Sequence, residues 1–134
     1  MAFWSGWLAV VALLTAGLVP LGYRMRQHRR AAPTSPTIKR HVLLGLATSA
    51  LAFGHTMAVL PALGSPAATG GGMLALLPAG AAFFLLVAHA GLGLQLRNEK
   101  LRDRVKKRRA HTVTAILISL AVAVHVIALE RAGH

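Results

Sequence analysis

Four apolar stretches, each long enough to cross a membrane, limit what this chain can fold into. They cover residues 3–22, 41–63, 72–96 and 111–130, and a helix needs about 20 such residues to span a bilayer. Hydrophobic residues make up 55% of the chain and charged residues only 13%, so the chain cannot build a water-soluble surface. We therefore expect an all-α integral membrane protein, in which residues 1–134 form a single up-down-up-down four-helix bundle.

The basic residues are divided unequally among the three connections. The chain contains 15 Lys and Arg against 3 Asp and Glu. Under the positive-inside rule, connections rich in Lys and Arg face the cytoplasm, so both termini and connection 64–72 are expected on the outer side. The sequence predicts a multi-pass protein of the cell membrane, of the bacterial inner-membrane type, whose basic runs contact anionic lipid rather than nucleic acid. Six cations lie in the first connection and eight in the third: Arg24, Arg26, Arg29, Arg30, Lys39 and Arg40, then Arg97, Lys100, Arg102, Arg104, Lys106, Lys107, Arg108 and Arg109.

Two histidine pairs share one spacing inside these apolar stretches. The second stretch contains His41-x13-His55, and the fourth contains His111-x13-His125. At 1.5 Å and about 100° per residue, the imidazoles of a pair fall nearly on one helix face, roughly 21 Å apart. Both stretches follow a basic connection and so run in the same direction. The four histidines are therefore expected at two levels, His41 with His111 near the cytoplasm and His55 with His125 nearer the outer side.

A facing pair of imidazoles suits axial ligation of a haem iron. Zinc or copper usually requires a third or fourth ligand at the same depth, and the only acids, Glu99, Asp103 and Glu130, lie near helix ends or in a connection. The chain has no cysteine, which excludes disulfides, thiolate-bound iron–sulfur clusters and covalent haem attachment through Cys-x-x-Cys-His.

Glycines and one further histidine complete the candidate site. Gly6 and Gly17 in the first stretch have the same spacing as Gly80 and Gly91 in the third, at matched depths. This repetition resembles a weak duplication of one hairpin, and glycine allows a planar group or another backbone to approach closely. Ordinary packing of small residues is the alternative. His89 is unpaired and lies between the two levels, where it has either a structural hydrogen bond or a secondary role at the haem.

The pattern His41-x13-His55 on the second helix and His111-x13-His125 on the fourth resembles the di-haem four-helix core of the b-type cytochromes, as in the cytochrome bc, b6f and b561-like proteins. The resemblance implies two haem b groups. His41 and His111 would ligate the iron on the cytoplasmic side, and His55 and His125 the iron on the outer side. The Pro-Glu-Trp-Tyr motif does not occur, so the resemblance does not extend to quinol oxidation by this chain alone.

These observations predict transmembrane electron transfer through two bis-histidine b haems, linking quinone to another electron carrier. We expect a redox carrier or a subunit of an oxidoreductase complex rather than an enzyme by itself. The expected partners are membrane lipid, quinone, another electron-transfer protein, and a second copy or a larger complex. One alternative is a haem-free membrane assembly or interaction subunit, with its histidines in interhelical hydrogen bonds. A divalent-metal transporter is disfavoured because the apolar stretches contain no carboxylate apart from Glu130, at the very end of the fourth.

Overall fold

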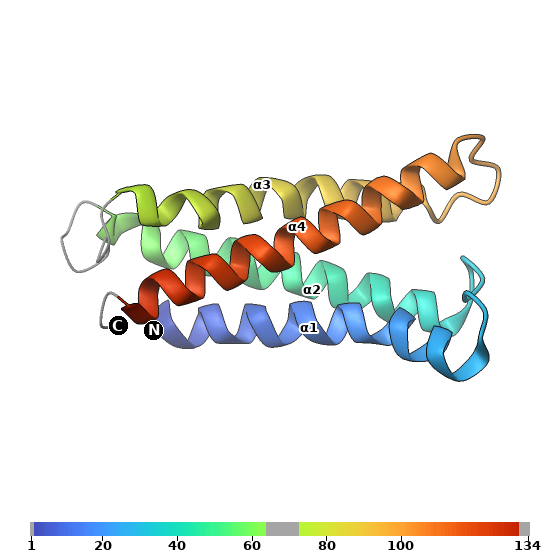
Figure 1. The fold of residues 1–134 in the computed structure, drawn as a ribbon, viewed down its shortest axis with the longest axis horizontal. Helices are drawn as coiled ribbons and strands as arrows, with labels where there is room; N and C mark the ends of the chain where they lie inside the picture. Colours follow the sequence, from blue (N-terminus) through green and yellow to red (C-terminus); the bar gives the residue numbers. More distant parts are fainter. Residues whose placement is uncertain (1, 64–72, 132–134) are drawn as a thin grey trace.

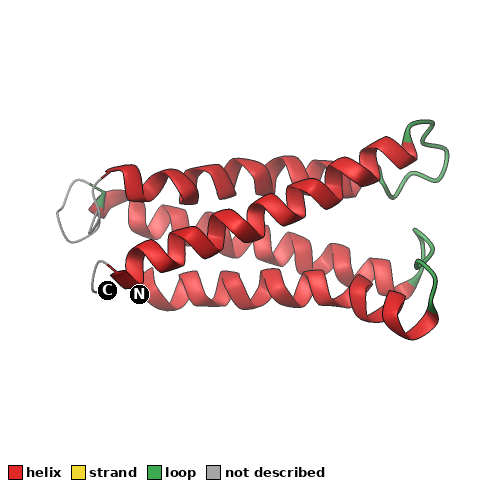
Figure 2. Ribbon diagram, in the orientation of Figure 1, coloured by secondary structure: helices red, strands yellow, loops and turns green. Residues whose placement is uncertain are grey.

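The computed structural model describes residues 2–63 and 73–131 and consists of four long helices (Figures 1 and 2). They are α1 (Ala2–Gln27), α2 (Pro36–Val59), α3 (Met73–Gln95) and α4 (Arg104–Arg131), and a single 3-10 turn at Leu60–Ala62 follows α2. No strand occurs in the described residues. The expectation of an all-α protein is confirmed.

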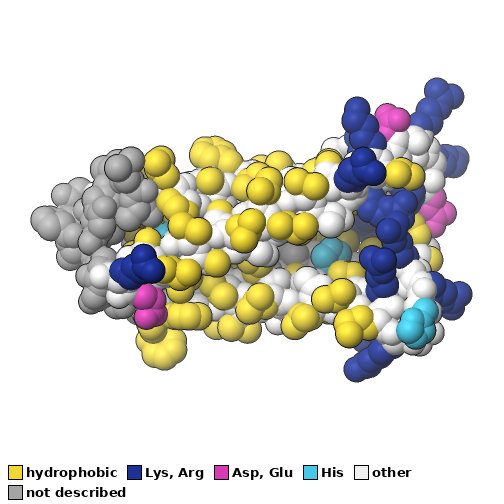
Figure 3. Space-filling view, in the orientation of Figure 1, with side chains coloured by type: hydrophobic (Ala, Val, Ile, Leu, Met, Phe, Trp, Pro, Cys, Tyr) yellow, Lys and Arg dark blue, Asp and Glu magenta, His cyan; other side chains and the backbone are white. Residues whose placement is uncertain are grey.

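Each of the four helices is long and apolar enough to cross a membrane. Large hydrophobic side chains cover the outside of the bundle (Figure 3): Trp4 is 72% exposed and Phe84 is 74% exposed. A surface of this kind requires lipid rather than water, as expected of a multi-pass membrane protein. In the described part of the chain, the buried hydrophobic residues are few and include two alanines: they are Ala16, Ala82, Leu86 and Ile118.

Two helices begin well before the apolar stretches that predicted them. Helix α2 begins at Pro36 rather than at residue 41, and α4 begins at Arg104 rather than at residue 111. Lys and Arg are good helix formers, and their long side chains reach water from a helix that continues past the bilayer. At the start of α2, the Ser35 hydroxyl accepts a hydrogen bond from the Ile38 N–H at 3.4 Å, and Pro36 occupies the first turn, where its missing N–H costs nothing.

The other helix ends also have local causes. Helix α1 continues to Gln27, past the end of its apolar stretch, and stops where His28 takes a φ of 50°. This left-handed conformation is the common C-terminal stop of a helix. Pro61 lies in the 3-10 turn that follows α2, and a proline cannot continue helical hydrogen bonding. The predicted connection 64–72 lies outside the described residues.

The helices alternate in direction along the bundle, and the start of α1 and the end of α4 lie together at one end of it (Figure 1). Helix α1 packs along α2 and α3 along α4, whereas the two hairpins meet mainly through α2 and α3. Connections 28–35 and 96–103 lie at the other end, where Lys and Arg gather (Figure 3). We call this the basic end, and the end where α1 starts and α4 ends the far end. At the basic end, the Thr34 hydroxyl donates a hydrogen bond to the Glu99 carboxylate at 3.3 Å and so joins the two connections.

The connection between α3 and α4 is fixed by the first turn of α4. The Arg104 guanidinium donates hydrogen bonds to the carbonyl of Leu96 at 2.6 Å and to that of Asn98 at 3.0 Å. These bonds satisfy backbone oxygens just after the end of α3, where the helix provides no partner. They help to set where α4 enters the bundle and, with it, the depth of His111.

Candidate functional site

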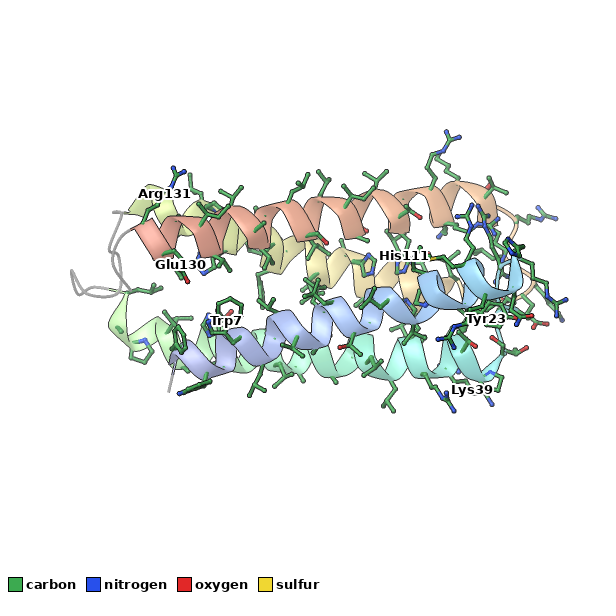
Figure 4. All side chains as sticks on the ribbon, turned by 60° about the horizontal axis from the view of Figure 1, so that its bottom comes forward. Trp7, Tyr23, Lys39, His111, Glu130 and Arg131 are labelled. Atoms are coloured by element: carbon green, nitrogen blue, oxygen red, sulfur yellow. The ribbon has the colours of Figure 1, made fainter. Side chains whose placement is uncertain are left out.

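His41 and His111 come together at the basic end, as the sequence predicts. Helix α2 carries His41 and α4 carries His111, and their ring centroids lie 6.1 Å apart with the planes at 89°. His111 lies toward the same end of the bundle as Tyr23 and Lys39 (Figure 4). We call His41 and His111 the basic-end pair.

The two rings of this pair are held in the same way. The Nδ1 of His41 donates a hydrogen bond to the Ala16 carbonyl on α1 at 2.8 Å, and the Nδ1 of His111 donates to the His89 carbonyl on α3 at 3.1 Å. A neutral imidazole that donates from Nδ1 keeps a lone pair on Nε2. Metal-binding histidines usually donate their second ring nitrogen to a carbonyl or carboxylate in this way, so both rings have the hydrogen bonding of metal ligands.

His55 and His125, the far-end pair, face one central cavity. Its volume is about 490 Å³, within the range of about 300–1,000 Å³ typical of ligand pockets. The Ser5 hydroxyl oxygen on α1 lies 3.1 Å from Nδ1 of His55. All four helices contribute to an apolar lining, in which the titratable side chains are His55, His125 and Glu130.

The cavity adjoins a groove on the side of the bundle. This groove, of about 290 Å³, lies between α1 and α4, whose backbones make few close contacts with each other. Cavity and groove share five lining residues: Trp7, Val10, Leu13, Val122 and Val126. The far-end cavity and the groove therefore adjoin each other along the seam between α1 and α4.

The two hairpins are related by an internal repeat. Cavity-lining residues of α1 and α3 form pairs that differ by 73 in residue number, as Phe3 and Leu76 do. Those of α2 and α4 form pairs that differ by 70, as Thr48 and Ile118 do. The carbonyl acceptors of the basic-end pair, Ala16 and His89, differ by 73 as well. Repeats of this kind place equivalent residues at equal depths in a membrane. The cavity pairs are Phe3 with Leu76, Gly6 with Ala79, Ala9 with Ala82, Val10 with Phe83 and Leu13 with Leu86, then Thr48 with Ile118, Ala52 with Val122, His55 with His125, Thr56 with Val126 and Val59 with Leu129.

Of the four glycines expected at the site, only Gly6 lies against a histidine. A methyl group added at Gly6 would lie 3.1 Å from Cε1 of His55, so Gly6 is part of the far-end site. At Gly17, Gly80 and Gly91 an added methyl group would meet nothing within 4 Å. Their expected role in approaching a haem stays a prediction.

Three features of the site were not identified from the sequence. A methyl group added at Gly93 would lie 3.1 Å from Cε1 of His111, and only the position of this glycine on α3, one helical turn after His89, could have indicated it. The hydroxyls of Ser5 and Thr114 lie against His55 and His89. The acceptor at Ala16 is a backbone carbonyl, for which residue type gives no signal.

His89 lies at the basic end rather than midway between the two levels. Its ring stacks on that of His111, with centroids 3.7 Å apart and planes at 14°, and its Nδ1 lies 2.9 Å from the Thr114 hydroxyl oxygen. Within the described residues, no group of three or more His, Cys, Asp or Glu has an arrangement that could hold a metal ion. A protein-only site of the zinc type is therefore not formed there.

No protein-family model matches this chain, and no match was found among curated proteins or among solved structures.

Proposed function

We propose that this protein carries electrons across a membrane through two b haems, each held by a histidine of α2 and a histidine of α4. The observation that supports this most strongly is the arrangement of the basic-end pair. Two rings from different helices lie with centroids 6.1 Å apart, and each donates from Nδ1 to a backbone carbonyl.

The separation of these rings suits two ligands on opposite sides of one iron. A metal–imidazole bond is about 2 Å long, so opposed ligands place their nitrogens about 4 Å apart and their ring centroids about 6 Å apart. The Ala16 and His89 carbonyls fix the tautomer in which Nε2 bears the lone pair. His41 and His111 would hold the haem iron through two strong nitrogen ligands, and haem b held in this way would supply one-electron transfer rather than oxygen chemistry.

The far-end pair fits a macrocycle for a different reason. His55 and His125 face the same cavity of about 490 Å³, and Gly6 leaves the Cε1 edge of His55 uncovered. The lining of Ala, Val, Leu and Phe side chains keeps water out and offers apolar walls to a planar group. The repeated His-x13-His spacing sets the two levels roughly 21 Å apart along the helices.

The distribution of charge supports one orientation in the membrane. Lys and Arg gather at the basic end (Figure 3), and the far end carries Arg131 beside Glu130 (Figure 4). We place the basic end in the cytoplasm and both termini outside, in a cell membrane of the bacterial inner-membrane type. The relationship to the b-type cytochromes belongs to this proposal, and so does the description of the chain as a carrier or subunit rather than an enzyme by itself.

The groove between α1 and α4 supports quinone as the partner at the far end. It is apolar, faces the surrounding lipid and shares its lining with the cavity of His55 and His125. A lipid-soluble electron carrier could reach the outer haem along this seam without passing through water. The second partner is another electron-transfer protein, which would reach the basic-end level from the cytoplasm.

A reduced-minus-oxidised visible spectrum of the purified protein in detergent tests the proposal. Two low-spin b haems are expected, with one assigned to each histidine level through single His→Ala variants. A colourless protein, expressed with an adequate supply of haem, would contradict it. The histidines would then be interhelical contacts of a haem-free interaction subunit.

A further inference from the structure

His89 is the third histidine of the basic end and belongs to neither proposed ligand pair. It contacts His111 at two places. The His89 carbonyl accepts the hydrogen bond from Nδ1 of His111 at 3.1 Å, and the His89 ring covers one face of the His111 ring, with centroids 3.7 Å apart and planes at 14°. The hydrogen bond fixes the position of Nδ1 of His111, and the stacking contact fixes the plane of its ring.

Thr114 determines how the His89 ring itself is held. The Thr114 hydroxyl donates its hydrogen to the carbonyl of His111 at 3.0 Å. Since a threonine hydroxyl has only one hydrogen, its oxygen is the acceptor in the 2.9 Å contact with Nδ1 of His89. His89 therefore donates from Nδ1, and its ring is tied to α4 within one turn of His111.

This arrangement is present in only one of the two repeated hairpins. Ala16 is the repeat equivalent of His89, and it supplies a carbonyl to His41 but has no ring to stack. Leu44 is the repeat equivalent of Thr114 and has no hydroxyl. The repeat therefore explains the carbonyl acceptors, but it does not explain the His89 ring or its anchor. Burying polar side chains in a membrane-spanning bundle costs free energy, and polar residues kept at such positions are typical of functional sites.

We propose that His89 is a positioning residue: anchored by Thr114, its ring holds the plane of the His111 imidazole perpendicular to that of His41. This inference rests on the haem-binding function proposed above and assigns to one side chain the geometry of the basic-end site. The angle between two axial imidazoles decides how evenly the iron d orbitals are split. Perpendicular planes leave two of these orbitals close in energy and give the ferric haem a large maximal g value in electron paramagnetic resonance.

The test compares the ferric resonance spectra and the redox midpoints of the full-length, haem-loaded protein and four variants. His89→Ala removes the stacked ring but keeps the backbone carbonyl. His89→Phe keeps a ring face and loses the hydrogen bond to Thr114. Thr114→Val removes the anchor with little change in shape. Thr112→Val is the matched control, because the Thr112 hydroxyl bonds only its own helix, α4, at the Arg108 carbonyl 3.0 Å away.

The basic-end signal is the one that His41→Ala abolishes. In His89→Ala we expect its maximal g value to fall and its midpoint to move, while the far-end signal stays unchanged. His89→Phe is expected to keep the wild-type g value, Thr114→Val to show a smaller fall than His89→Ala, and Thr112→Val to leave both signals unchanged.

The proposal is overturned if His89→Ala leaves the basic-end signal as in the wild type, or if His89→Phe shifts it as far as His89→Ala does. If His89→Ala loses the basic-end haem altogether, His89→Phe and Thr114→Val decide. The proposal is supported if His89→Phe keeps the wild-type signal and Thr114→Val shifts it. Any other result contradicts the proposal. A wild-type protein without haem signals would instead show that the haem-binding function is wrong. The two failures are therefore distinct.

Discussion

The ring of His41 on α2 lies perpendicular to the ring of His111 on α4, with an angle of 89° and a centroid separation of 6.1 Å. The two hydrogen bonds that hold these rings end on carbonyls of two further helices, α1 and α3. All four helices thus contribute to one site at the basic end. Loss of either histidine is therefore expected to act on that level alone.

Single histidine variants are expected to remove one haem each. His111→Ala leaves His41 without its partner and should lower the haem content from two to one per chain, and His125→Ala should do the same at the far end. The double variant should lose both. Absorbance of the extracted haem measures the content, and His28→Ala, which alters a histidine in the first connection, should retain two. Two haems retained in His111→Ala would rule out this histidine as a ligand.

Two glycines, Gly93 on α3 and Gly45 on α2, provide a test of the basic-end geometry. An alanine methyl at position 93 would lie 3.1 Å from Cε1 of His111. Because that ring is held by a carbonyl and by the His89 ring, it has little freedom to move aside. Gly93→Ala should shift the visible spectrum and midpoint of the basic-end haem.

Gly45→Ala, on α2, is the matched control, since its methyl group would meet nothing within 4 Å. It should leave both haems unchanged and stabilise the helix by up to about 1 kcal/mol. Equal spectral shifts in the two variants would contradict the close approach at Gly93.

Packing between the two levels depends on Ile118. Its side chain is 2% exposed, whereas that of Ile116, on the same helix, is 55% exposed. Replacing a packed isoleucine with alanine costs about 2–5 kcal/mol. Since lipid tails are as apolar as the bundle interior, only the packing part of this cost applies, and we expect about 2 kcal/mol for Ile118→Ala. Unfolding of the haem-loaded protein in mixed micelles measures the difference, and Ile116→Ala should be near neutral. Equal losses in the two would refute the assignment of Ile118 to the interior.

Much of the fold follows from the sequence, because the length of an apolar stretch sets whether a helix can cross a bilayer. The shared His-x13-His spacing also predicted that His41 lies level with His111, and His55 with His125. In the structure the first two rings lie close together, and the other two line one cavity. The sequence does not show which residue of α3 is equivalent to Gly6 of α1. Matching Gly6 with Gly80 assumes an offset between α1 and α3 that is too long by one position, because the cavity lining pairs Gly6 with Ala79. A shift of one position is about 100° of helix rotation, and Gly80 is not among the residues that line this cavity.

The partners of the histidine rings could not be predicted for a different reason. Ala16 and His89 accept hydrogen bonds through backbone carbonyls, which every residue type carries. The stacking of His89 on His111 depends on the rotation of α3 against α4, and the sequence determines that rotation only through the packing of the whole bundle.

The proposed orientation predicts where the termini lie. Every Lys and Arg except Arg131 lies in or beside connections 28–35 and 96–103, so we expect the basic end in the cytoplasm. An alkaline phosphatase fused after residue 134 should be active, and a fluorescent protein that folds only in the cytoplasm should be dark at the same site. The opposite pattern would reverse the assignment of the two haem levels to the two sides of the membrane.

The ratio of haem b to protein chain tests whether the two histidine pairs bind haem. It is obtained from the pyridine haemochrome absorbance and an amino-acid analysis of the same purified sample. We expect two haems per chain, one for His41 with His111 and one for His55 with His125. A ratio near zero, in protein made with an ample supply of haem and shown to be folded, would contradict this expectation.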